Sequence, residues 1–342
     1  MNKWLDSPSD VEDVVVSSRI RLARNINDHK FPTKLTIDES DKLTDEVLNG
    51  LKESLLENYK FIRVRDLDHN LKMEYVENHL ISPKLVKNGE KSSFLLRDDE
   101  RVTIMLNEED HLRIQVLSRG LNFEENWEIL NEIDDTIDKN LEYAFDKKWG
   151  YLTSCPTNVG TGLRVSSMLH LPCLTQTGNM KSLIQGLAKI DITTRGFFGE
   201  GTNIIGNMYQ ISNQRTLGES EDEIIKKMEE IIYQVVSRER QTREYLKEHK
   251  RLDMEDKIYR SFGILKYAKK INIKEAMLHL SNIRLGIEMG LIDNINYETI
   301  TKLMMDIQPY TIQNRNFDIN DKSDIEIIRS NILKDFLNDM EG

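Results

Sequence analysis

The stretch VEDVVVSSRIRLAR, residues 11–24, combines β-branched side chains with a period-two alternation, which is the pattern of a half-buried strand. The alternation places Arg19 and Arg21 on one face and Ile20 and Leu22 on the other. The Cα atoms of the two arginines are then about 6.6 Å apart, a spacing that suits adjacent phosphate groups. For this pair alone, a solvated strand edge with each arginine paired to an acidic side chain is the simpler interpretation.

Two later runs alternate in the same way. RVTIML (101–106) and HLRIQVL (111–117) flank the polar turn NEED (107–110), which predicts a β-hairpin. In the second run the apolar residues share the buried face, which leaves Arg113 on the opposite, polar face. A third strand-borne arginine is therefore available to bind the same anion.

Helical periodicity is strongest in two later segments. Residues 123–146 carry apolar side chains at spacings of three and four, and Asn122 together with Glu125 resembles a capping box at the start of this run. Residues 221–237 repeat the pattern behind a second capping-box sequence. Both segments are predicted to be amphipathic helices that cover the sheet.

The character of the chain changes near residue 240. The segment 151–218 is rich in glycine, as expected for turns or for backbone that approaches a ligand closely. Beyond it the chain consists almost wholly of helix formers. We therefore predict an α+β domain over residues 1–240 and a smaller, all-helical domain over residues 241–342.

The first part of this helical region is a charged run, residues 238–251. Such a run is usually a solvated helix face, and Glu239 and Arg243 have the i,i+4 spacing of a surface ion pair. A partner surface is the alternative interpretation.

Composition narrows the classes of function. The formal net charge of −11 opposes the long-range attraction that a general nucleic-acid binder needs. No apolar run approaches the roughly 20 residues of a membrane span, and the N-terminus lacks the regions of a signal peptide, so a cytoplasmic location away from membranes is expected. The two cysteines, Cys155 and Cys173, form no zinc spacing, and no structural metal site is predicted.

Two more arginines lie beside glycine turns. Arg164 follows VGTG, where a helix is expected to begin and free backbone N–H groups would favour an anion. Arg195 opens the glycine-flanked segment RGFFGEG. With the three strand arginines they suggest a triphosphate held by guanidinium groups, because arginine makes planar, bidentate contacts to phosphate. The Walker A, HRD and DFG motifs of other nucleotide enzymes are missing from the sequence.

The NEED turn offers two neighbouring carboxylates, Glu108 and Glu109. A protonated guanidinium is a poor nucleophile, so its phosphorylation requires a carboxylate that orients the group and takes its proton. NEED is also a common composition for a solvated turn, which is the favoured interpretation of these four residues alone. Cys155 is either a buried hydrophobe or a thiolate stabilised by positive charge, whereas Cys173, after Pro172, is expected to be structural.

Four segments together resemble the phosphagen kinase family, which includes arginine and creatine kinases. SSRIRLARNI, NEEDHLRIQ, SCPTNVGTGLR and RGFFGEG occur here in the family's order. The resemblance implies that the chain binds ATP with Mg2+. It also implies that Glu109 is the carboxylate base with Glu108 beside it, and that Cys155 is the thiol near the guanidinium group.

The nucleotide-binding residues also follow from the resemblance. His79, in VENHLISP, is similar to a histidine on the nucleotide side of the family's site. The complete set implied to bind ATP is Ser17, Ser18, Arg19, Ile20, Arg21, His79, Arg113, Arg164, Val165, Ser166, Ser167, Met168, Arg195, Gly196, Phe197, Phe198, Gly199 and Glu200.

The arrangement of the chain is similar to that of bacterial protein arginine kinases. Phosphagen kinases that act on small molecules place a helical domain before the SSRIR strand, whereas sixteen residues precede Ser17 here and a helical part follows the catalytic motifs. The implied fold is an antiparallel β-sheet flanked by helices, followed by a helical domain that pairs two protomers. The implied partners are protein substrates with exposed arginines, a regulatory activator and a protease-associated unfoldase, in a stress response or degradation pathway.

One motif of that branch departs from the pattern. Its C-terminal RDxxRA sequence, which binds phosphoarginine, is reduced here to IEIIRS at residues 325–330. Only Arg329 and an acidic residue, Glu326, are retained. Regulation by phosphoarginine is therefore not expected, and both residues are predicted to lie on the surface of a terminal helix.

The leading hypothesis is in-line transfer of the γ-phosphoryl group of Mg-ATP to an arginine side chain of a protein. A kinase for free arginine or another small guanidino compound is the alternative within enzymes. A non-catalytic, nucleotide-binding adaptor that controls a repressor or a protease is the alternative from another class.

Overall fold

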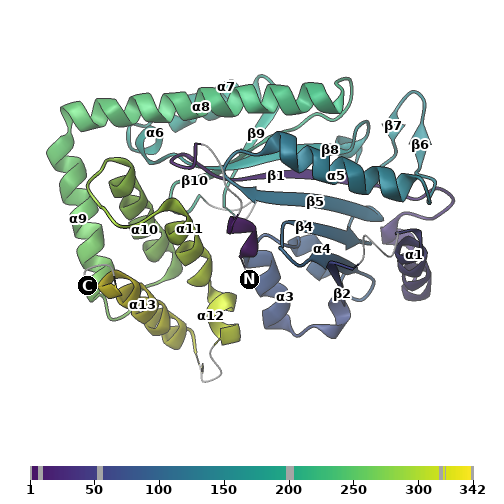
Figure 1. Cartoon of the computed structure of the whole chain (residues 1–342), viewed down its shortest axis with the longest axis horizontal. Helices are drawn as coiled ribbons and strands as arrows, with labels where there is room; N and C mark the ends of the chain where they lie inside the picture. The colour runs from purple at the N-terminus through teal and green to yellow at the C-terminus, as the bar shows by residue number, and fades with distance from the viewer. Residues whose placement is uncertain are drawn as a thin grey trace. The chain divides into compact units, whose positions relative to one another are not determined.

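The computed structural model of the chain describes residues 2–6, 11–51, 57–197, 204–315, 319 and 321–339 (Figure 1). Its central feature is an antiparallel eight-stranded sheet with the strand order β2-β3-β4-β5-β1-β8-β10-β9. The strands are β1 (Val15–Arg24), β2 (Tyr59–Arg63), β3 (Ser93–Arg97), β4 (Val102–Leu106), β5 (Leu112–Arg119), β8 (Leu163–His170), β9 (Ile192–Arg195) and β10 (Met208–Asn213). A separate two-stranded hairpin consists of β6 (Phe145–Asp146) and β7 (Gly150–Tyr151). The predicted fold class, an α+β protein with helices flanking an antiparallel sheet, is confirmed.

Contacts within the chain divide it into two compact units. The first comprises Met1–Ser9, Ser17–Ser167 and Ser212–Glu230, and the second comprises Asp10–Val16, Met168–Ile211 and Ile231–Gly342. Helix α8 (Glu221–His249) passes without a break through the predicted domain boundary near residue 240. That boundary stays a prediction.

The first unit contains the strands β2 to β7 and the helices that cover them. These helices are α1 (Ile37–Gly50), α3 (His69–Glu77), α4 (Pro83–Lys87) and α5 (Phe123–Asp138). Helix α5 packs on β5, and Figure 1 shows it running along one face of the sheet. The predicted hairpin is confirmed, because β4 pairs antiparallel with β5 and Ile104 is opposite Ile114.

Helix α5 differs from its prediction at both ends. It ends at Asp138 rather than at residue 146, because the chain then turns into the β6–β7 hairpin. Asn122 occupies the N-cap position, but its side chain donates to the Arg119 carbonyl oxygen instead of accepting a helix N–H. Glu125 pairs with Arg101, so the predicted capping box does not form.

The helices that follow β8 begin with α6 (Pro172–Gln176) and α7 (Met180–Ala188). After α8 come α9 (Arg251–Tyr267), α10 (Ile273–Glu288), α11 (Tyr297–Asp306), α12 (Pro309–Arg315) and α13 (Lys322–Asp339). The capping box predicted for α8 is confirmed: the Glu223 amide donates to Ser220 Oγ, and the Ser220 amide donates to Glu223 Oε2. Among the described residues, no helix has the length and apolar character needed to cross a membrane.

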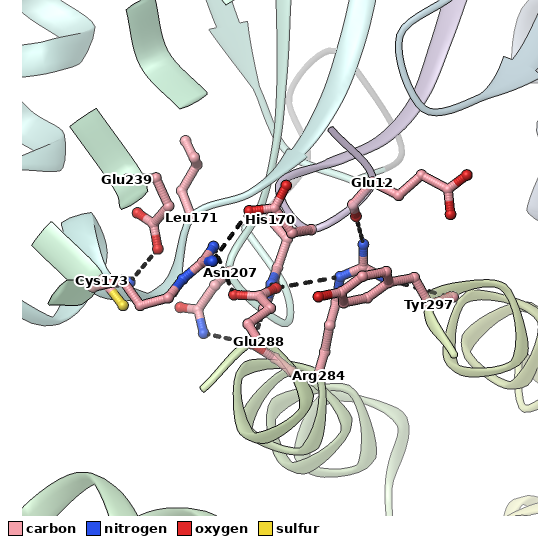
Figure 2. Close-up of polar contacts among 12 residues, drawn as sticks. Glu12, His170, Leu171, Cys173, Asn207, Glu239, Arg284, Glu288 and Tyr297 are labelled. Carbon is pink, nitrogen blue, oxygen red and sulfur yellow. Dashed lines mark hydrogen bonds and ion pairs between the residues drawn. The ribbon is translucent and has the colours of Figure 1, made fainter. Parts of the chain in front are cut away.

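A network of buried charges joins segments of the second unit (Figure 2). Glu288 at the end of α10 lies 2.9 Å from Arg243 of α8 and 3.1 Å from the Nδ1 atom of His170. Arg243 also pairs with Asp13 at 3.1 Å. Arg284, one turn before Glu288, donates to the Glu12 carbonyl oxygen. Charged side chains thus tie together the segment before β1, the end of β8 and the helices α8 and α10.

This network overturns the surface ion pair predicted between Glu239 and Arg243, although most side chains of the charged run 238–251 are exposed, as expected. Glu239 is fully buried and accepts hydrogen bonds from the backbone amides of Cys173 and Leu174 at 2.8 and 3.0 Å. Arg243 is buried and binds Asp13 and Glu288 rather than Glu239. The i,i+4 spacing predicts a surface pair, but both side chains bind partners from other parts of the chain instead. Cys173 is buried, consistent with the structural role expected for it.

The prediction for Arg329 was also wrong. Its side chain in α13 is 2% exposed and donates to the carbonyl oxygens of Ile307 and Ile271 at 2.9 and 3.1 Å. Buried carbonyl groups need donors, and a guanidinium group can serve two of them at once. Glu326 pairs with Lys270 at 3.3 Å.

Candidate active site

Four of the five predicted arginines belong to three adjacent strands of the first unit. Arg19 and Arg21 lie on β1, Arg113 on β5 and Arg164 on β8, and β1 is the strand between the other two. The alternation of β1 is confirmed, because Ile20 and Leu22 are fully buried while Arg19 and Arg21 are partly exposed. In the register of β1 and β5, Ala23 is opposite Arg113.

These arginines are close enough for their charges to interact. Burial lowers the pKa of Arg21 well below its ordinary value. The positive charges of the other three arginines lower the pKa further, and the Glu108 carboxylate opposes them. Because a guanidinium group does not lose its proton in a protein, the four guanidinium groups concentrate positive charge in one place. Such a site favours a polyanion.

Arg164 is held by a strand, which differs from the predicted helix start. Its Nη2 atom donates to the Ser212 hydroxyl at 3.0 Å. The Val165 amide donates to Asn213 Oδ1 at 2.8 Å, so β8 is tied to β10 on one side. On the other side the Ala23 amide of β1 donates to Gly162, just before β8. The backbone groups that a helix would use are thus taken up by the sheet.

Glu108, the first carboxylate of the NEED turn, is 1% exposed. It pairs with Arg113 and accepts from the Ser82 hydroxyl and, at 3.0 Å, from the Glu109 amide. Burial alone would raise the pKa of Glu108, but the Arg113 charge and these hydrogen bonds outweigh it, and the pKa lies below its ordinary value. The turn is therefore not solvated, contrary to the interpretation favoured from its composition.

Glu109 has a different environment from its neighbour. Its side chain is 28% exposed, and its Oε1 atom lies 2.5 Å from the ammonium group of Lys84. Lys84 is itself half exposed and lies in the short helix α4. A cationic group already rests against Glu109, so the carboxylate can receive a positively charged acceptor. Of the two carboxylates, Glu109 is the one that remains accessible.

Ser82 and Lys84 were not singled out from the sequence. They lie on the segment after α3, which β5 holds through Gln115: its Nε2 atom donates to the carbonyl oxygens of His79 and Leu80 at 3.0 and 2.8 Å. The signal that could have found Ser82 is its position before Pro83, since Ser followed by Pro is a common helix start. Ser82 does cap α4, by accepting from the Leu85 amide.

His79 is a partly buried histidine. Burial lowers the pKa of its ring to about 3, and the nearby charge of Arg19 contributes in the same direction. Its backbone has φ 61°, which is unusual for a residue other than glycine. A neutral ring beside Arg19 does not add to the positive charge of the cluster, and its contact with nucleotide stays a prediction.

Cys155 is partly exposed and lies at the end of the segment that follows β7. Its Sγ atom is 3.0 Å from the Thr157 hydroxyl, and the Thr153 hydroxyl donates to its carbonyl oxygen at 2.8 Å. The amide of the preceding residue, Ser154, donates to Asp110 of the NEED turn at 2.6 Å. The cysteine segment and the turn are therefore in direct contact.

Several predicted ATP-binding residues have side chains on the other face of the sheet. Ser18 Oγ lies 3.0 Å from Ser118 Oγ and accepts from the Asn122 amide at the start of α5. Ile20 and Val165 are fully buried. Ser167 is buried on the same face of β8 as Val165. Ser17 and Ser166 are also buried, but they share the faces of Arg19 and Arg164, and Ser166 donates to the Arg19 carbonyl oxygen at 3.4 Å.

The remaining predicted residues lie outside the first unit or outside the described residues. Met168, Arg195, Gly196 and Phe197 belong to the second unit, where Arg195 ends β9 and Phe197 is 2% exposed. Phe198, Gly199 and Glu200 lie outside the described residues. The ATP contacts of all these residues stay predictions.

The family model described as ATP:guanido phosphotransferase, C-terminal catalytic domain, matches residues 40–242. The chain belongs to the ATP:guanido phosphotransferase family. Residues 251–342 match a second family model, described as the Protein-arginine kinase McsB C-terminal domain. The resemblance stated from the four sequence motifs is confirmed.

Relatives in this family are similar over nearly all of the chain. A protein-arginine kinase of Clostridium novyi is 43% identical over 347 residues, covering 100% of both proteins. One from Clostridium kluyveri is 46% identical over 316 residues, covering 92% of each. One from Halothermothrix orenii is 41% identical over 338 residues, covering 99% of this chain and 97% of the relative.

Solved structures of ATP:guanido phosphotransferases share the fold. The duplicated taurocyamine kinase from Schistosoma mansoni with bound transition state analog components has a TM-score of 0.60 and 26% identity. The match covers 68% of this chain and 33% of that longer, duplicated chain. Lombricine kinase has a TM-score of 0.57 and 25% identity, and 67% of each chain is covered.

Proposed function

We propose that this guanidino phosphotransferase transfers the γ-phosphoryl group of ATP to arginine side chains of proteins. One observation carries the proposal. In the first unit, four arginines on adjacent strands lie close to the NEED turn and its two carboxylates. The arginines suit the phosphates and the accessible carboxylate suits a guanidinium acceptor.

Each side of the reaction uses a different part of this arrangement. Arg19, Arg21 and Arg164 would neutralise the phosphates, because guanidinium groups stabilise charge on a transferring phosphoryl group. Arg113 would do the same while paired with Glu108, which fixes its orientation. Mg2+ would bind the phosphates through their oxygens, with water as its other ligands.

Glu109 would act on the acceptor. The guanidinium group would displace Lys84 from the Glu109 carboxylate, which is the one exposed to substrate. As the bond between the guanidinium nitrogen and the γ-phosphorus forms, the bond to the ADP oxygen breaks and the nitrogen loses a proton to Glu109. The products are ADP, a phosphorylated arginine and a protonated carboxyl group.

A protein acceptor is favoured over a free guanidino compound. The relatives named protein-arginine kinases are similar over both units, and the match to the C-terminal domain model covers residues 251–342. The intact cluster of arginines and the paired carboxylates disfavour the adaptor alternative, because an adaptor needs no accessible base. We further propose that the enzyme acts in the cytoplasm, as a homodimer, during stress. It marks proteins there for degradation, together with an activator and a protease-associated unfoldase.

One incubation tests the proposal. The protein is mixed with Mg-ATP and either an unfolded, arginine-rich protein or free arginine, and phosphoarginine is measured by mass spectrometry with mild, non-acidic handling. Acid-labile phosphate on the protein is the expected result. Phosphate on free arginine alone would favour the small-molecule alternative, and ATP binding without any transfer would favour the adaptor.

A further inference from the structure

The last residue of the NEED turn, Asp110, is buried among hydrogen-bond donors. Its side chain is 3% exposed, and its Oδ1 atom accepts from Asn25 Nδ2 at 2.7 Å and from the Ser154 amide at 2.6 Å. Burial raises the pKa of Asp110, even though these hydrogen bonds lower it. Burial of a carboxylate costs free energy, and here the hydrogen bonds to Asn25 and Ser154 offset that cost. We therefore take the role of Asp110 to be to hold these groups together.

Asn25 completes the arrangement from the end of β1. Its side chain is 2% exposed, and its Oδ1 atom accepts from the His111 amide at 2.9 Å. Its Nδ2 atom also donates to the Leu152 carbonyl oxygen at 3.0 Å. Two side chains, Asn25 and Asp110, therefore join three segments that are far apart in the sequence: the end of β1, the NEED turn and residues 152–154.

A neutral imidazole braces the same place. His111 Nδ1 accepts from the Ile26 amide at 3.0 Å, so its Nε2 atom carries the proton and donates to the Lys30 carbonyl oxygen at 2.8 Å. Burial lowers the pKa of this ring to about 4. The imidazole keeps the chain after Asn25 against the hairpin and adds no charge next to Asp110.

The three joined segments carry the groups proposed to face the acceptor. Glu109 precedes Asp110 and Cys155 follows Ser154, so the hydrogen bond from the Ser154 amide to the Asp110 carboxylate has a proposed acceptor-side group one residue away at each end. Phosphoryl transfer is sensitive to position, and a displacement of about 1 Å can lower a rate about 100-fold. A shift of the turn relative to the cysteine segment would move the base away from the thiol.

We propose that Asp110 and Asn25 are positioning residues for phosphoryl transfer, which set the distance between Glu109 and Cys155 on the acceptor side of the site. The inference rests on the proposed function, because that function places Glu109 at the acceptor. Both side chains are buried and hydrogen-bonded within the chain, so we expect the pair to govern the rate of transfer and not the binding of ATP.

Reversing the polarity of the pair tests the proposal. N25D places a second carboxylate against Asp110, and D110N is the conservative control. The double variant N25D/D110N restores a hydrogen bond, now donated by the amide at position 110. We expect N25D to lower kcat for protein phosphorylation by about 10-fold to 100-fold at an unchanged KM for ATP. We expect the double variant to recover part of that loss, because the hydrogen bond between positions 25 and 110 returns while the Leu152 carbonyl oxygen stays without its donor from position 25.

The second measurement does not depend on activity. Cys155 is partly exposed and Cys173 is buried, so alkylation by iodoacetamide in the native state reports on the cysteine segment. N25D should raise the alkylation rate of Cys155 and the double variant should lower it again, with thermal unfolding measured in parallel.

Unchanged kcat and alkylation in N25D, or a double variant as slow as N25D, would overturn the proposal. A kcat loss that simply follows the loss of thermal stability would also overturn it. If wild type transfers no phosphate, the proposed function fails, yet the alkylation result still shows whether the pair holds the segment.

Discussion

Glu108 and Glu109 are neighbours with the same side chain, yet the structure gives them separate tasks. Glu108 is buried between Arg113 and the Ser82 hydroxyl, whereas Glu109 is accessible and contacts Lys84. E109Q should therefore lower the rate of phosphoryl transfer about 100-fold or more, because the amide cannot take a proton. ATP affinity, measured by calorimetry, should stay within about twofold. Normal turnover by E109Q would refute its assignment as the base.

The matched substitution at position 108 should affect stability. E108Q leaves the Arg113 guanidinium next to Arg21 without a neutralising carboxylate, and breaking a buried, charged pair costs about 2 to 4 kcal/mol. Urea unfolding should show this loss of stability for E108Q and almost none for E109Q, whose side chain is partly exposed. Equal losses for the two variants would contradict the distinction between a structural and an accessible carboxylate.

At the scale of elements, one short turn determines how β8 enters the sheet. Gly162 has φ +65°, and a Cβ atom there would lie 2.6 Å from the Ala23 carbonyl oxygen of β1. G162A should therefore destabilise the first unit by more than about 2 kcal/mol, from backbone strain and from the clash. G178A is the control, because Gly178 also has positive φ (+74°) but nothing lies within 4 Å of its Cβ position. It should cost only about 1 kcal/mol. Similar unfolding midpoints for the two variants would contradict this account.

Local patterns predicted the elements whose partners are close in sequence. The β4–β5 hairpin and the alternation of β1 follow from a period of two, and the α8 capping box follows from residues three apart. The part of the site carried by these strands, Arg19, Arg21 and Arg113, could thus be placed in advance.

Tertiary partners were beyond the reach of such patterns. Arg164 was expected at a helix start, but β1 and β10 capture its segment from both sides. Glu239 was expected in solvent, but its carboxylate is buried and accepts hydrogen bonds from backbone amides at the start of α6. Asp110 was not singled out at all, because its partners come from two other segments of the chain. A single sequence offers no local signal for such contacts.

At the scale of the whole molecule, buried histidines make stability depend on pH. The folded pKa of His111 is about 4 and that of His79 about 3, both depressed from 6.5 by burial. Below pH 6.5, the two imidazole rings therefore bind protons in the unfolded chain but stay unprotonated in the folded chain until the pH approaches their folded pKa values. The stabilising contribution is complete above pH 6.5 and is lost as pH falls toward the folded pKa, by about 1.4 kcal/mol per pH unit for each ring. Urea unfolding from pH 7 to 4.5 should show this decline, and H111N should show a shallower slope. An equal slope would contradict a neutral His111.

The second unit contains a group with the opposite pH dependence. Burial raises the pKa of Glu239 from 4.5 to about 7, although two backbone amides oppose the shift. Between these values the folded chain holds a proton that the unfolded chain releases, so stability is lost as pH rises from 4.5 to 7 and no further above it. E239Q removes this term, and its stability relative to wild type should rise by about 1.4 kcal/mol per pH unit across that window. His111 and His79 lie in the first unit and Glu239 in the second. Through these three groups, acid weakens the first unit and a rise of pH from 4.5 to 7 weakens the second, which together give a stability maximum near pH 6.5. A difference between E239Q and wild type that does not vary with pH would show that Glu239 is ionised throughout in the folded protein.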